Sequence, residues 1–524
     1  MRGLIQRSRA LFVICVAGLL LMACGGGGGS SSDDATASID DAISSDDSSA
    51  SVDDGISGDD DTDTSVDDAI SSDDSSASVD DGISSDDATA SVDDGVCGVT
   101  SQKAFVRDVA QSWYLWVDEL ADPDPADYTT AQAYLDALIE PLFLDGRDPR
   151  FSYVTTQQED QASFATGAYI GFGFRYTQEP FNAGEQWWFL DVLEGSPAGD
   201  AGLTRGQQIL AIDTGSGFET VDELTARDAT ITEIFGPSDV GVERGFRVRE
   251  GGAIKEVTLV KRELDTPPLA GQPLLIERLG LSPVGYFHLR GFQDNATQPL
   301  IEATTLFAEA GVTDMVIDLR YNSGGSIEEA YLLLDLIGGI AAQGEESFRL
   351  AHNRLRAQAE DISRFFEPRT GSMNPLRIAF ITTGGSASAS EMIINSLEPW
   401  FEVVLVGEDT LGKAVGQYAF SQTGCDTLLR LVSFELVNGE GLGGWYEGLA
   451  ATGRFTLCPA EDDYTRGFGD PEEASLQVAL DWLNSGVCGD STASSRSQLR
   501  GLYRGPSNAP MVKPLPGGRS VWQQ

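Results

Sequence analysis

The sequence predicts an α+β multidomain protein with an N-terminal helical segment, a β-rich domain and a C-terminal α/β domain. Three observations lead to this fold class. Apolar residues recur at helical spacing over 98–165. Short apolar runs bounded by glycine turns fill 167–264. From about residue 275, buried-strand patterns alternate with helical patterns, which indicates a largely parallel sheet.

The composition shifts along the 524 residues divide the chain into six parts. They are a lipoprotein signal peptide (1–24), a disordered acidic Asp/Ser-rich linker (25–96), a helical domain (97–165), a β-rich domain (166–265), an α/β domain (266–488) and a polar C-terminal tail (489–524).

The N-terminus has the features of a bacterial export signal. Three arginines precede an apolar core, Ala10 to Met22, that is too short to span a membrane. The run Leu21-Met22-Ala23-Cys24 resembles a lipobox, which implies that Cys24 is lipidated. The alternative is an ordinary secretory signal with an incidental cysteine. Gly25 follows where an inner-membrane retention signal has aspartate, so we expect a lipid-anchored protein of the outer membrane, facing the periplasm or the cell surface.

The linker cannot bury enough apolar surface to fold. It contains 22 aspartates and no lysine or arginine, and Ser-Val-Asp-Asp recurs every 13 or 14 residues. Calcium binding is the functional alternative, but calcium loops use a bidentate glutamate and this stretch has none. We interpret it as a solvated spacer.

The acidic balance excludes nucleic acid as a partner. Removing the 22 aspartates of the linker from the net charge of −48 leaves −26, whereas nucleic-acid binding requires a basic surface. We expect neither a metal nor a cofactor, because no CxxC pair exists and His288 and His352 are isolated.

Four cysteines remain after Cys15 and Cys24 are assigned to the signal. An even number in an exported protein indicates two disulfides, with three connectivities open. We favour Cys425 with Cys458, and Cys97 with Cys488.

In the helical domain, an aromatic and aliphatic stripe runs from Phe105 to Trp116 and a second amphipathic pattern from Ala131 to Leu142. We interpret both as core. The β-rich domain opens with five residues whose glycines would expose backbone N–H groups, namely Ile170, Gly171, Phe172, Gly173 and Phe174.

That glycine loop alone would also fit a bulge or a hairpin. It is followed, however, by a strand-like run, Trp187 to Leu193, and then by Ser196-Pro197-Ala198-Gly199-Asp200-Ala201-Gly202-Leu203 before Gly206 to Asp213. With both halves in order, the region resembles a PDZ domain, although Gln207 stands where aspartate is usual. The resemblance implies that the glycine loop binds a peptide's C-terminal carboxylate.

In the α/β domain, five strands are expected over 285–289, 315–319, 378–382, 403–406 and 415–420, and three helices over 300–310, 326–336 and 391–397. Each candidate motif falls just after a strand, where the sites of parallel sheets gather.

The chemistry is concentrated in two segments that lie 25 residues apart. Ser388 stands in Gly384-Gly385-Ser386-Ala387-Ser388-Ala389-Ser390-Glu391 before a helix, and Lys413 follows the next strand. A desolvated lysine can accept the proton of a serine hydroxyl, so the pair predicts a nucleophile and its general base. Gln417 lies four residues on and can orient the amine.

A third segment, Asp318-Leu319-Arg320-Tyr321-Asn322-Ser323-Gly324-Gly325, makes a strand-to-helix turn. Its glycines expose N–H groups near a helix N-terminus, as an oxyanion hole requires. We assign Gly324 or Gly325 together with Ala389 to that role.

The run from Gly407 to Ala414 nearly matches the motif of a phosphate-binding P-loop, which would give Lys413 a different role. Ala414 lacks the hydroxyl that would bind magnesium, and the residues that follow read as a strand instead of a helix. We therefore reject the P-loop.

Together these segments resemble the carboxyl-terminal processing (tail-specific) serine proteases, peptidase family S41, over roughly 100–485. The motifs are Gly285-Tyr286-Phe287, Asp318-Leu319-Arg320 with Asn322 and Gly324-Gly325, Ser386 to Glu391, and Gly412-Lys413. The resemblance implies an α/β domain of the ClpP/crotonase-like type in which Ser388 is the nucleophile and Lys413 the base, assisted by Gln417. Glu391 and Thr410 match supporting positions, whereas Pro399 stands where some members carry an aspartate.

The expected function is that of a serine endopeptidase (EC 3.4.21) acting on exported proteins captured by their C-terminal tails. The expected partners are peptide or protein substrates, the membrane through the lipid anchor, and a regulatory adaptor protein. The alternative is a non-enzymatic PDZ scaffold with a degenerate protease domain. A missing serine or lysine would favour it, and neither is missing.

Overall fold

The computed structural model describes residues 95–164, 169–181 and 184–488. The signal peptide with Cys24, the acidic linker up to residue 94 and the tail from residue 489 lie outside the described residues.

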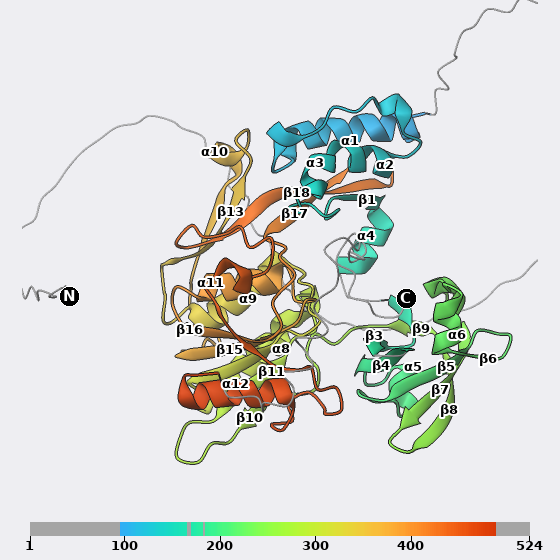
Figure 1. Cartoon of the computed structure of the whole chain (residues 1–524). Helices are drawn as coiled ribbons and strands as arrows, with labels where there is room; N and C mark the ends of the chain where they lie inside the picture. Colours follow the sequence, from blue (N-terminus) through green and yellow to red (C-terminus); the bar gives the residue numbers. More distant parts are fainter. Residues whose placement is uncertain (1–94, 165–168, 182–183, 489–524) are drawn as a thin grey trace, which may run out of the picture. The chain divides into compact units, whose positions relative to one another are not determined.

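The N-terminal helices pack against the hairpin of β17 (Val415–Ser421) and β18 (Thr427–Asn438) (Figure 1). They are α1 (Val99–Trp113), α2 (Ala131–Leu138) and α3 (Glu140–Leu144), with the short turns η1 (Val117–Glu119) and η2 (Pro125–Asp127). Thr130 starts α2 by accepting a hydrogen bond from Ala133 N–H. The stripe expected to be core contributes Val106, which is fully buried, while its aromatic residues Phe105, Trp113 and Trp116 are partly buried and pack against the same cluster.

After these helices comes a strand that the sequence did not predict, β1 (Tyr153–Thr156), and then α4 (Gln157–Phe164). β1 pairs antiparallel with β18 (Thr427–Asn438), and β18 also pairs with β17 (Val415–Ser421). Two further strands complete this antiparallel sheet. They are β13 (Glu346–His352) and β14 (Ile362–Phe365), which are joined by α10 (Ala357–Glu360). The expected region 415–420 is thus a strand, but it belongs to an antiparallel sheet.

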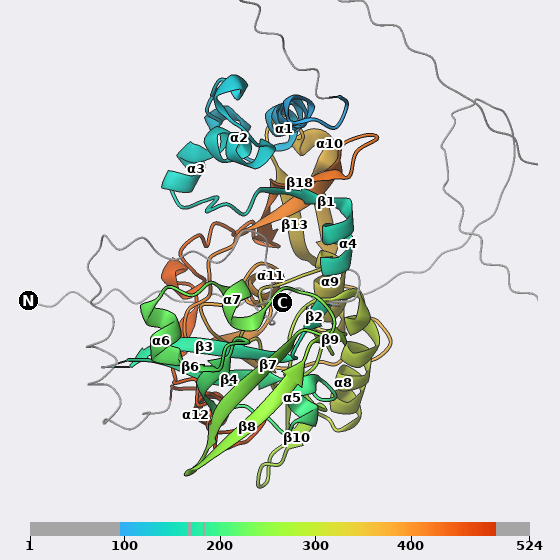
Figure 2. The same cartoon turned by 90° about the vertical axis from the view of Figure 1, so that its right-hand side faces the viewer.

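Residues 169–264 form a β-rich module of their own (Figure 2). Its main sheet has the order β3-β4-β5-β7-β8, with β3 at an edge, and a smaller sheet pairs β2 with β9. The strands are β2 (Tyr169–Gly171), β3 (Phe174–Phe181), β4 (Gly184–Val192), β5 (Gln208–Asp213), β6 (Phe218–Thr220), β7 (Glu243–Glu250), β8 (Ala253–Val260) and β9 (Arg262–Leu264). The helices are α5 (Pro197–Asp200), α6 (Val221–Ala226) and α7 (Ile231–Phe235).

The predicted α/β domain contains the expected largely parallel sheet, in the order β10-β11-β12-β15-β16-β19. Its strands are β10 (Leu274–Ile276), β11 (Val284–His288), β12 (Asp314–Asp318), β15 (Arg377–Thr382), β16 (Glu402–Gly407) and β19 (Thr456–Pro459). The helices are α8 (Thr297–Glu309), α9 (Ile327–Gly338), α11 (Ala389–Leu397) and α12 (Ala474–Ser485), with the turns η3 (Asp294–Ala296) and η4 (Ala450–Thr452). All residues of β11 and β12 are buried, as helices on both faces of a parallel sheet require.

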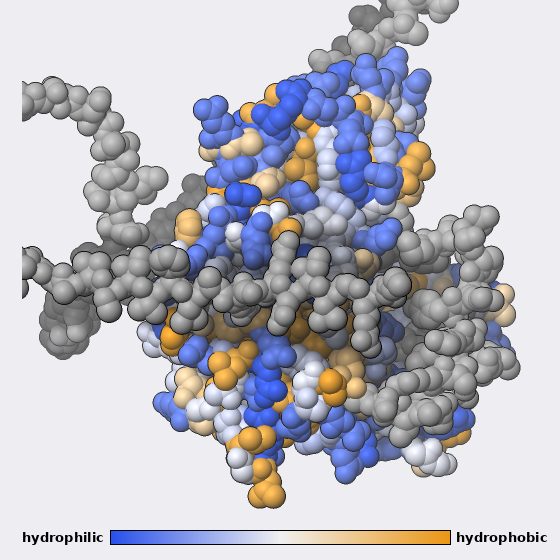
Figure 3. Space-filling model, turned by 60° about the vertical axis from the view of Figure 1, so that its left-hand side comes forward, coloured by the Kyte–Doolittle hydropathy of each residue, from blue (hydrophilic) through white to orange (hydrophobic). Residues whose placement is uncertain are grey.

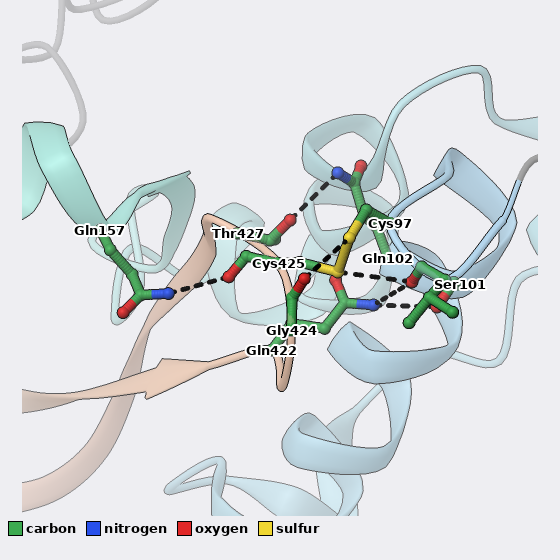
Figure 4. The surroundings of a disulfide bond; sticks show 9 residues. Cys97, Ser101, Gln102, Gln157, Gln422, Gly424, Cys425 and Thr427 are labelled. Atoms are coloured by element: carbon green, nitrogen blue, oxygen red, sulfur yellow. Dashed lines mark hydrogen bonds between the residues drawn. A yellow bond between two sulfur atoms is a disulfide. The ribbon is translucent and has the colours of Figure 1, made fainter.

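The four folded-region cysteines are paired, but the favoured connectivity was wrong. The structure joins Cys97 to Cys425 and Cys458 to Cys488. Cys425 lies in the turn between β17 and β18, and this turn meets the start of α1, where Gln422 donates hydrogen bonds to Val96 O and Ser101 Oγ (Figure 4). Cys458 lies on β19, whereas Cys488 follows α12. Tertiary proximity, not position in the chain, decides these pairs.

Replacing Cys97 and Cys425 together by serine should lower the free energy of unfolding by about 2–5 kcal/mol, because the bond closes a very long loop in the unfolded chain. Denaturant unfolding under oxidising conditions measures this loss. The matched control is Cys458→Ser with Cys488→Ser. The sequence separations are 328 and 30 residues, so chain entropy alone makes the first loss larger by about 2 kcal/mol. A smaller loss for the first pair would contradict the prediction.

Within the described ranges, no helix is long and apolar enough to cross a membrane, and no group of three or more His, Cys, Asp or Glu side chains is arranged to hold a metal ion. Hydrophilic and hydrophobic side chains are interspersed on the face in Figure 3. The most exposed apolar side chains include Leu279 and Leu281, in the hairpin between β10 and β11.

Candidate active site

Ser388 lies between the end of β15 and the start of α11, in a sharp turn of the backbone. Its φ of 57° and ψ of −114° are unusual for a residue with a side chain. Such conformations cost about 1–3 kcal/mol and persist where the surrounding structure enforces them. The turn projects Ser388 from the N-terminus of α11, where the helix dipole favours negative charge.

Hydrogen bonding separates Ser388 from its two neighbouring serines. Ser386 is buried and donates from Oγ to Leu319 O at 2.7 Å, and Ser390 is buried and donates to Asn322 O at 2.9 Å. These two hydroxyls thus fasten the serine loop to the loop after β12. Ser388 is half-buried, and its hydroxyl donates to no acceptor among the described residues.

Lys413 lies in the loop between β16 and β17 and is half-buried. Its Nζ donates to Gln417 Oε1 at 2.7 Å, and no described hydrogen bond joins it to Ser388. Burial lowers the pKa of Lys413 to about 8, although the carboxylates of Asp148 and Glu391 act in the opposite direction. A substantial fraction of this amine is therefore neutral just above neutral pH.

Glu391 joins the serine loop to the lysine loop. Its fully buried carboxylate accepts the N–H of Ser388 at 2.8 Å, of Gly412 at 2.7 Å and of Lys413 at 2.9 Å. Burial raises its pKa to about 7, while the Thr410 hydroxyl and these N–H groups lower it. Thr410 Oγ1 also accepts Leu449 N–H. The residues matched to supporting positions thus hold the two loops together.

The loop after β12 lies directly against Ser388. A Cβ placed on Gly324, whose φ is 107°, would lie 2.9 Å from Ala389 N and 2.9 Å from Ser388 Cβ. Ala389 N–H donates to no acceptor among the described residues. The space in front of this N–H is therefore open only because residue 324 is glycine.

The two glycines assigned to the oxyanion hole have different environments. Gly324 N–H already donates to Asn322 Oδ1 at 2.9 Å. A Cβ on Gly325 would lie 2.1 Å from Phe292 O, so this glycine permits the chain to pass the segment after β11. The oxyanion assignment stays a prediction, and Ala389 is the donor that the geometry favours within it.

Residues from two other parts of the chain contact this region, although the sequence analysis predicted no site residue in those positions. Gln417 Nε2 donates to Phe151 O, so the segment before β1 borders the lysine. From the β-rich module, Arg175 donates to Tyr321 O at 2.5 Å and Arg205 to Tyr321 Oη at 3.0 Å. Tyr321 precedes Asn322 in the same loop. None of these three contacts has a local sequence signal, because each joins residues more than 100 positions apart.

The glycine loop of the β-rich module precedes its edge strand β3. Phe172 and Phe174 are buried, and Gly173 has a φ of 87°. The carbonyls of Phe172 and Gly173 accept Ala198 N–H and Leu193 N–H. The N–H groups of these two residues donate to no acceptor among the described residues. Ile170 and Gly171 are paired with β9.

Residues 283–443, which include Ser388, Lys413 and Gly324, match the family model described as Peptidase family S41. Residues 101–153 match that described as Peptidase S41 N-terminal domain. Two segments of the chain therefore match domain models of peptidase family S41. The resemblance inferred from the motifs is thereby confirmed.

The chain is also similar to curated proteins from a bacterium and a plant. It is 31% identical over 255 residues to the carboxyl-terminal-processing protease of Synechocystis sp., covering 49% of this chain and 55% of that protein. It is 27% identical over 320 residues to the chloroplastic carboxyl-terminal-processing peptidase 2 of Arabidopsis thaliana, covering 59% and 58%. The chain therefore spans little more than half the length of these curated relatives.

The fold is similar to that of a solved protein assigned to the S41 proteases, from Bacteroides fragilis NCTC 9343. The TM-score is 0.58 at 23% identity, with 73% of this chain and 97% of that chain covered. This likeness supports the mixed α/β architecture of the chain.

Proposed function

We propose that the chain is a serine endopeptidase of the carboxyl-terminal processing type (EC 3.4.21), which cleaves exported proteins through a Ser388–Lys413 dyad. The arrangement around Glu391 carries the proposal: one buried carboxylate holds the backbone of a strained, half-buried serine and of a lysine whose pKa is lowered to about 8. Neither a scaffold nor a core requires this combination of strain and desolvation. The S41 match and the names of the relatives support it.

In the proposed reaction, the neutral Lys413 amine takes the Ser388 proton as Oγ attacks the peptide carbonyl carbon. The C=O bond opens to an oxyanion, which the Ala389 N–H stabilises in the space beside Gly324. The C–N bond then breaks, and the Lys413 ammonium returns its proton to the leaving amine. Water hydrolyses the acyl-enzyme with Lys413 again as the base. Because Ser388 Oγ and Lys413 Nζ share no described hydrogen bond, this contact would form when substrate is bound.

We further propose that the β-rich module is a PDZ domain that captures a substrate's C-terminal tail. Edge strand β3 offers one unpaired side for strand addition by a peptide. The N–H groups of Phe172 and Gly173, which have no described acceptor, would bind the terminal carboxylate. The glycine loop of residues 170–174 would thus supply the carboxylate site.

Cleavage of two unfolded substrates tests both the proposed peptidase activity and the proposed capture of the substrate's C-terminal tail. The substrates share one sequence with an apolar C-terminus, and one carries a free carboxylate while the other carries an amide. We expect the free acid to be cleaved about tenfold or more faster, mainly through KM. A fluorophosphonate probe should label Ser388, as peptide mass spectrometry would show. Equal cleavage of both would refute tail capture, whereas absence of labelling and of cleavage would favour the non-enzymatic scaffold.

Peptidase activity should depend on pH through Lys413. Only its neutral amine can accept the Ser388 proton, so kcat/KM should rise with pH through a midpoint of about 8 and then level off. Rates measured from about pH 6 to about pH 10 on one unfolded substrate provide the check. A flat profile across this range would argue against lysine as the base.

The lipid anchor at Cys24, an outer-membrane location facing the periplasm or surface, and a regulatory adaptor also stay proposals. Radiolabelled palmitate incorporated into the wild-type chain but not into Cys24→Ala would support the anchor. Incorporation into both chains would refute it.

A further inference from the structure

The amine of Lys413 is bordered by a segment that comes from the N-terminal helical region. Lys413 Nζ lies 5.0 Å from the centre of the Phe151 ring, close enough for a cation–π contact when the amine is protonated. Gln417, which accepts the hydrogen bond from Nζ, donates its own Nε2 to Phe151 O at 2.5 Å. Phe151 therefore covers the amine with its ring and orients the Gln417 amide with its carbonyl.

Asp148 fixes the backbone of this segment from within the core. Its carboxylate is fully buried and accepts four hydrogen bonds: from Phe151 N–H at 2.7 Å, Ser152 N–H at 3.2 Å, Ser152 Oγ at 2.7 Å and Tyr114 Oη at 3.0 Å. Tyr114 is the C-cap residue that directly follows α1. The carboxylate thus links the helical region to the turn that presents Phe151.

Strand β18 of the antiparallel sheet also holds this segment. Ser152 Oγ accepts Val432 N–H at 3.1 Å, and Tyr153, the first residue of β1, pairs with Arg430 of β18. Phe151 consequently lies at a junction between two regions of the chain, and its position depends on both.

We propose that Phe151 and Asp148 are positioning residues for the general base: Phe151 forms one wall of the Lys413 pocket and Asp148 holds that wall in place. This inference rests on the proposed function, since it assigns the N-terminal region a part in preparing Lys413. The helical region is then a component of the active centre as well as a packing partner.

Charged groups from three elements face the amine. Asp148 lies on the segment before β1, Glu391 on α11 and Arg430 on β18. The two carboxylates favour the protonated amine, and Arg430, itself paired with Asp160 at 2.7 Å, disfavours it. Burial is the largest influence and lowers the pKa of Lys413. Removing the Phe151 ring and removing the Asp148 charge should therefore shift the pKa of Lys413 in opposite directions.

Two variants test these opposite effects. Phe151→Ala admits water to the amine and should move the midpoint of the kcat/KM profile to higher pH by about one unit. Asp148→Asn keeps the shape but removes the charge, and should move it to lower pH by about half a unit. Phe105→Ala is the matched control, because it removes a phenyl ring from the same hydrophobic cluster on α1 and should leave the midpoint unchanged. Phe151→Leu serves as the second variant where Phe151→Ala does not fold.

A readout independent of activity separates this inference from the proposed function. The chain has five lysines, so trace acetylation with acetic anhydride over a pH series, read by peptide mass spectrometry, titrates Lys413 against Lys255 as an internal standard. Opposite shifts of Lys413 in the two variants support the inference even in a chain without peptidase activity. An unshifted Lys413 titration in a folded Phe151 variant, or the same shift in Phe105→Ala, overturns it even in an active enzyme.

Discussion

Ser388→Ala and Lys413→Ala should each lower kcat/KM on an unfolded substrate by about 10⁴-fold or more, because removal of a nucleophile or its base eliminates the covalent route. Lys413→Arg should be nearly as inactive. A guanidinium keeps the positive charge but does not lose its proton at accessible pH, so it cannot act as the base. Full activity in Ser388→Ala or Lys413→Ala would refute the dyad.

Ser386→Ala and Ser390→Ala are the matched controls for Ser388. Their hydroxyls donate to Leu319 O and Asn322 O, which also accept the N–H groups of Asn322 and Ala387, so each substitution removes one buried hydrogen bond and should cost about 0.5–1.5 kcal/mol of stability. A folded variant of either should retain fluorophosphonate labelling at Ser388. Loss of labelling with the fold intact would assign the nucleophile to a different serine of the loop.

Gly324→Ala should lower kcat by about 10²–10³-fold, the range seen when an oxyanion-hole donor is lost. The new methyl group would lie 2.9 Å from Ala389 N, in the place proposed for the oxyanion, and also 2.9 Å from Ser388 Cβ. The φ of 107° adds backbone strain, so kcat has to be measured on protein whose fold is verified by circular dichroism.

Gly385→Ala provides the control for Gly324→Ala within the serine loop. The nearest atoms to a Cβ there are Tyr321 Cα at 3.5 Å and Thr383 Oγ1 at 3.6 Å, which are ordinary contacts. We expect Gly385→Ala to change kcat by less than about threefold. Equal losses in the two variants would mean that the loop tolerates no side chain at all, and would remove the support for an oxyanion site at Gly324.

The parallel sheet was predictable because its strands are continuous apolar runs buried on both faces. β12, β15 and β16 all fall within one residue of their expected bounds at either end. The antiparallel sheet that contains β17 and β18 was not predictable in the same way. Its strand β18 pairs with β1 across more than 270 residues, and no local pattern specifies such a partner. The sequence accordingly showed β17 as a strand without showing its sheet.

For the cysteines too, the sequence predicted one property and only the tertiary structure decided the other. Their even number, in a chain expected to be exported, predicted two disulfides, which the structure contains. The pairing depends on the β17–β18 turn meeting the start of α1, a contact with no signal in the spacing of the cysteines.

The sequence by itself determined which residues are candidates for the proposed chemistry. The candidate residues form local patterns, and local patterns can be recognised without knowledge of the fold. They are a serine before a helix, a lysine after the next strand, Gln417 four residues further on, and a glycine pair between a strand and a helix. The tertiary structure decided which serine hydroxyl donates to no acceptor among the described residues, that Glu391 joins both loops, and that Phe151 and Asp148 border the amine. The physical reason is that burial and hydrogen-bond partners are properties of residues brought together from distant parts of the chain, and these properties set the pKa of Lys413.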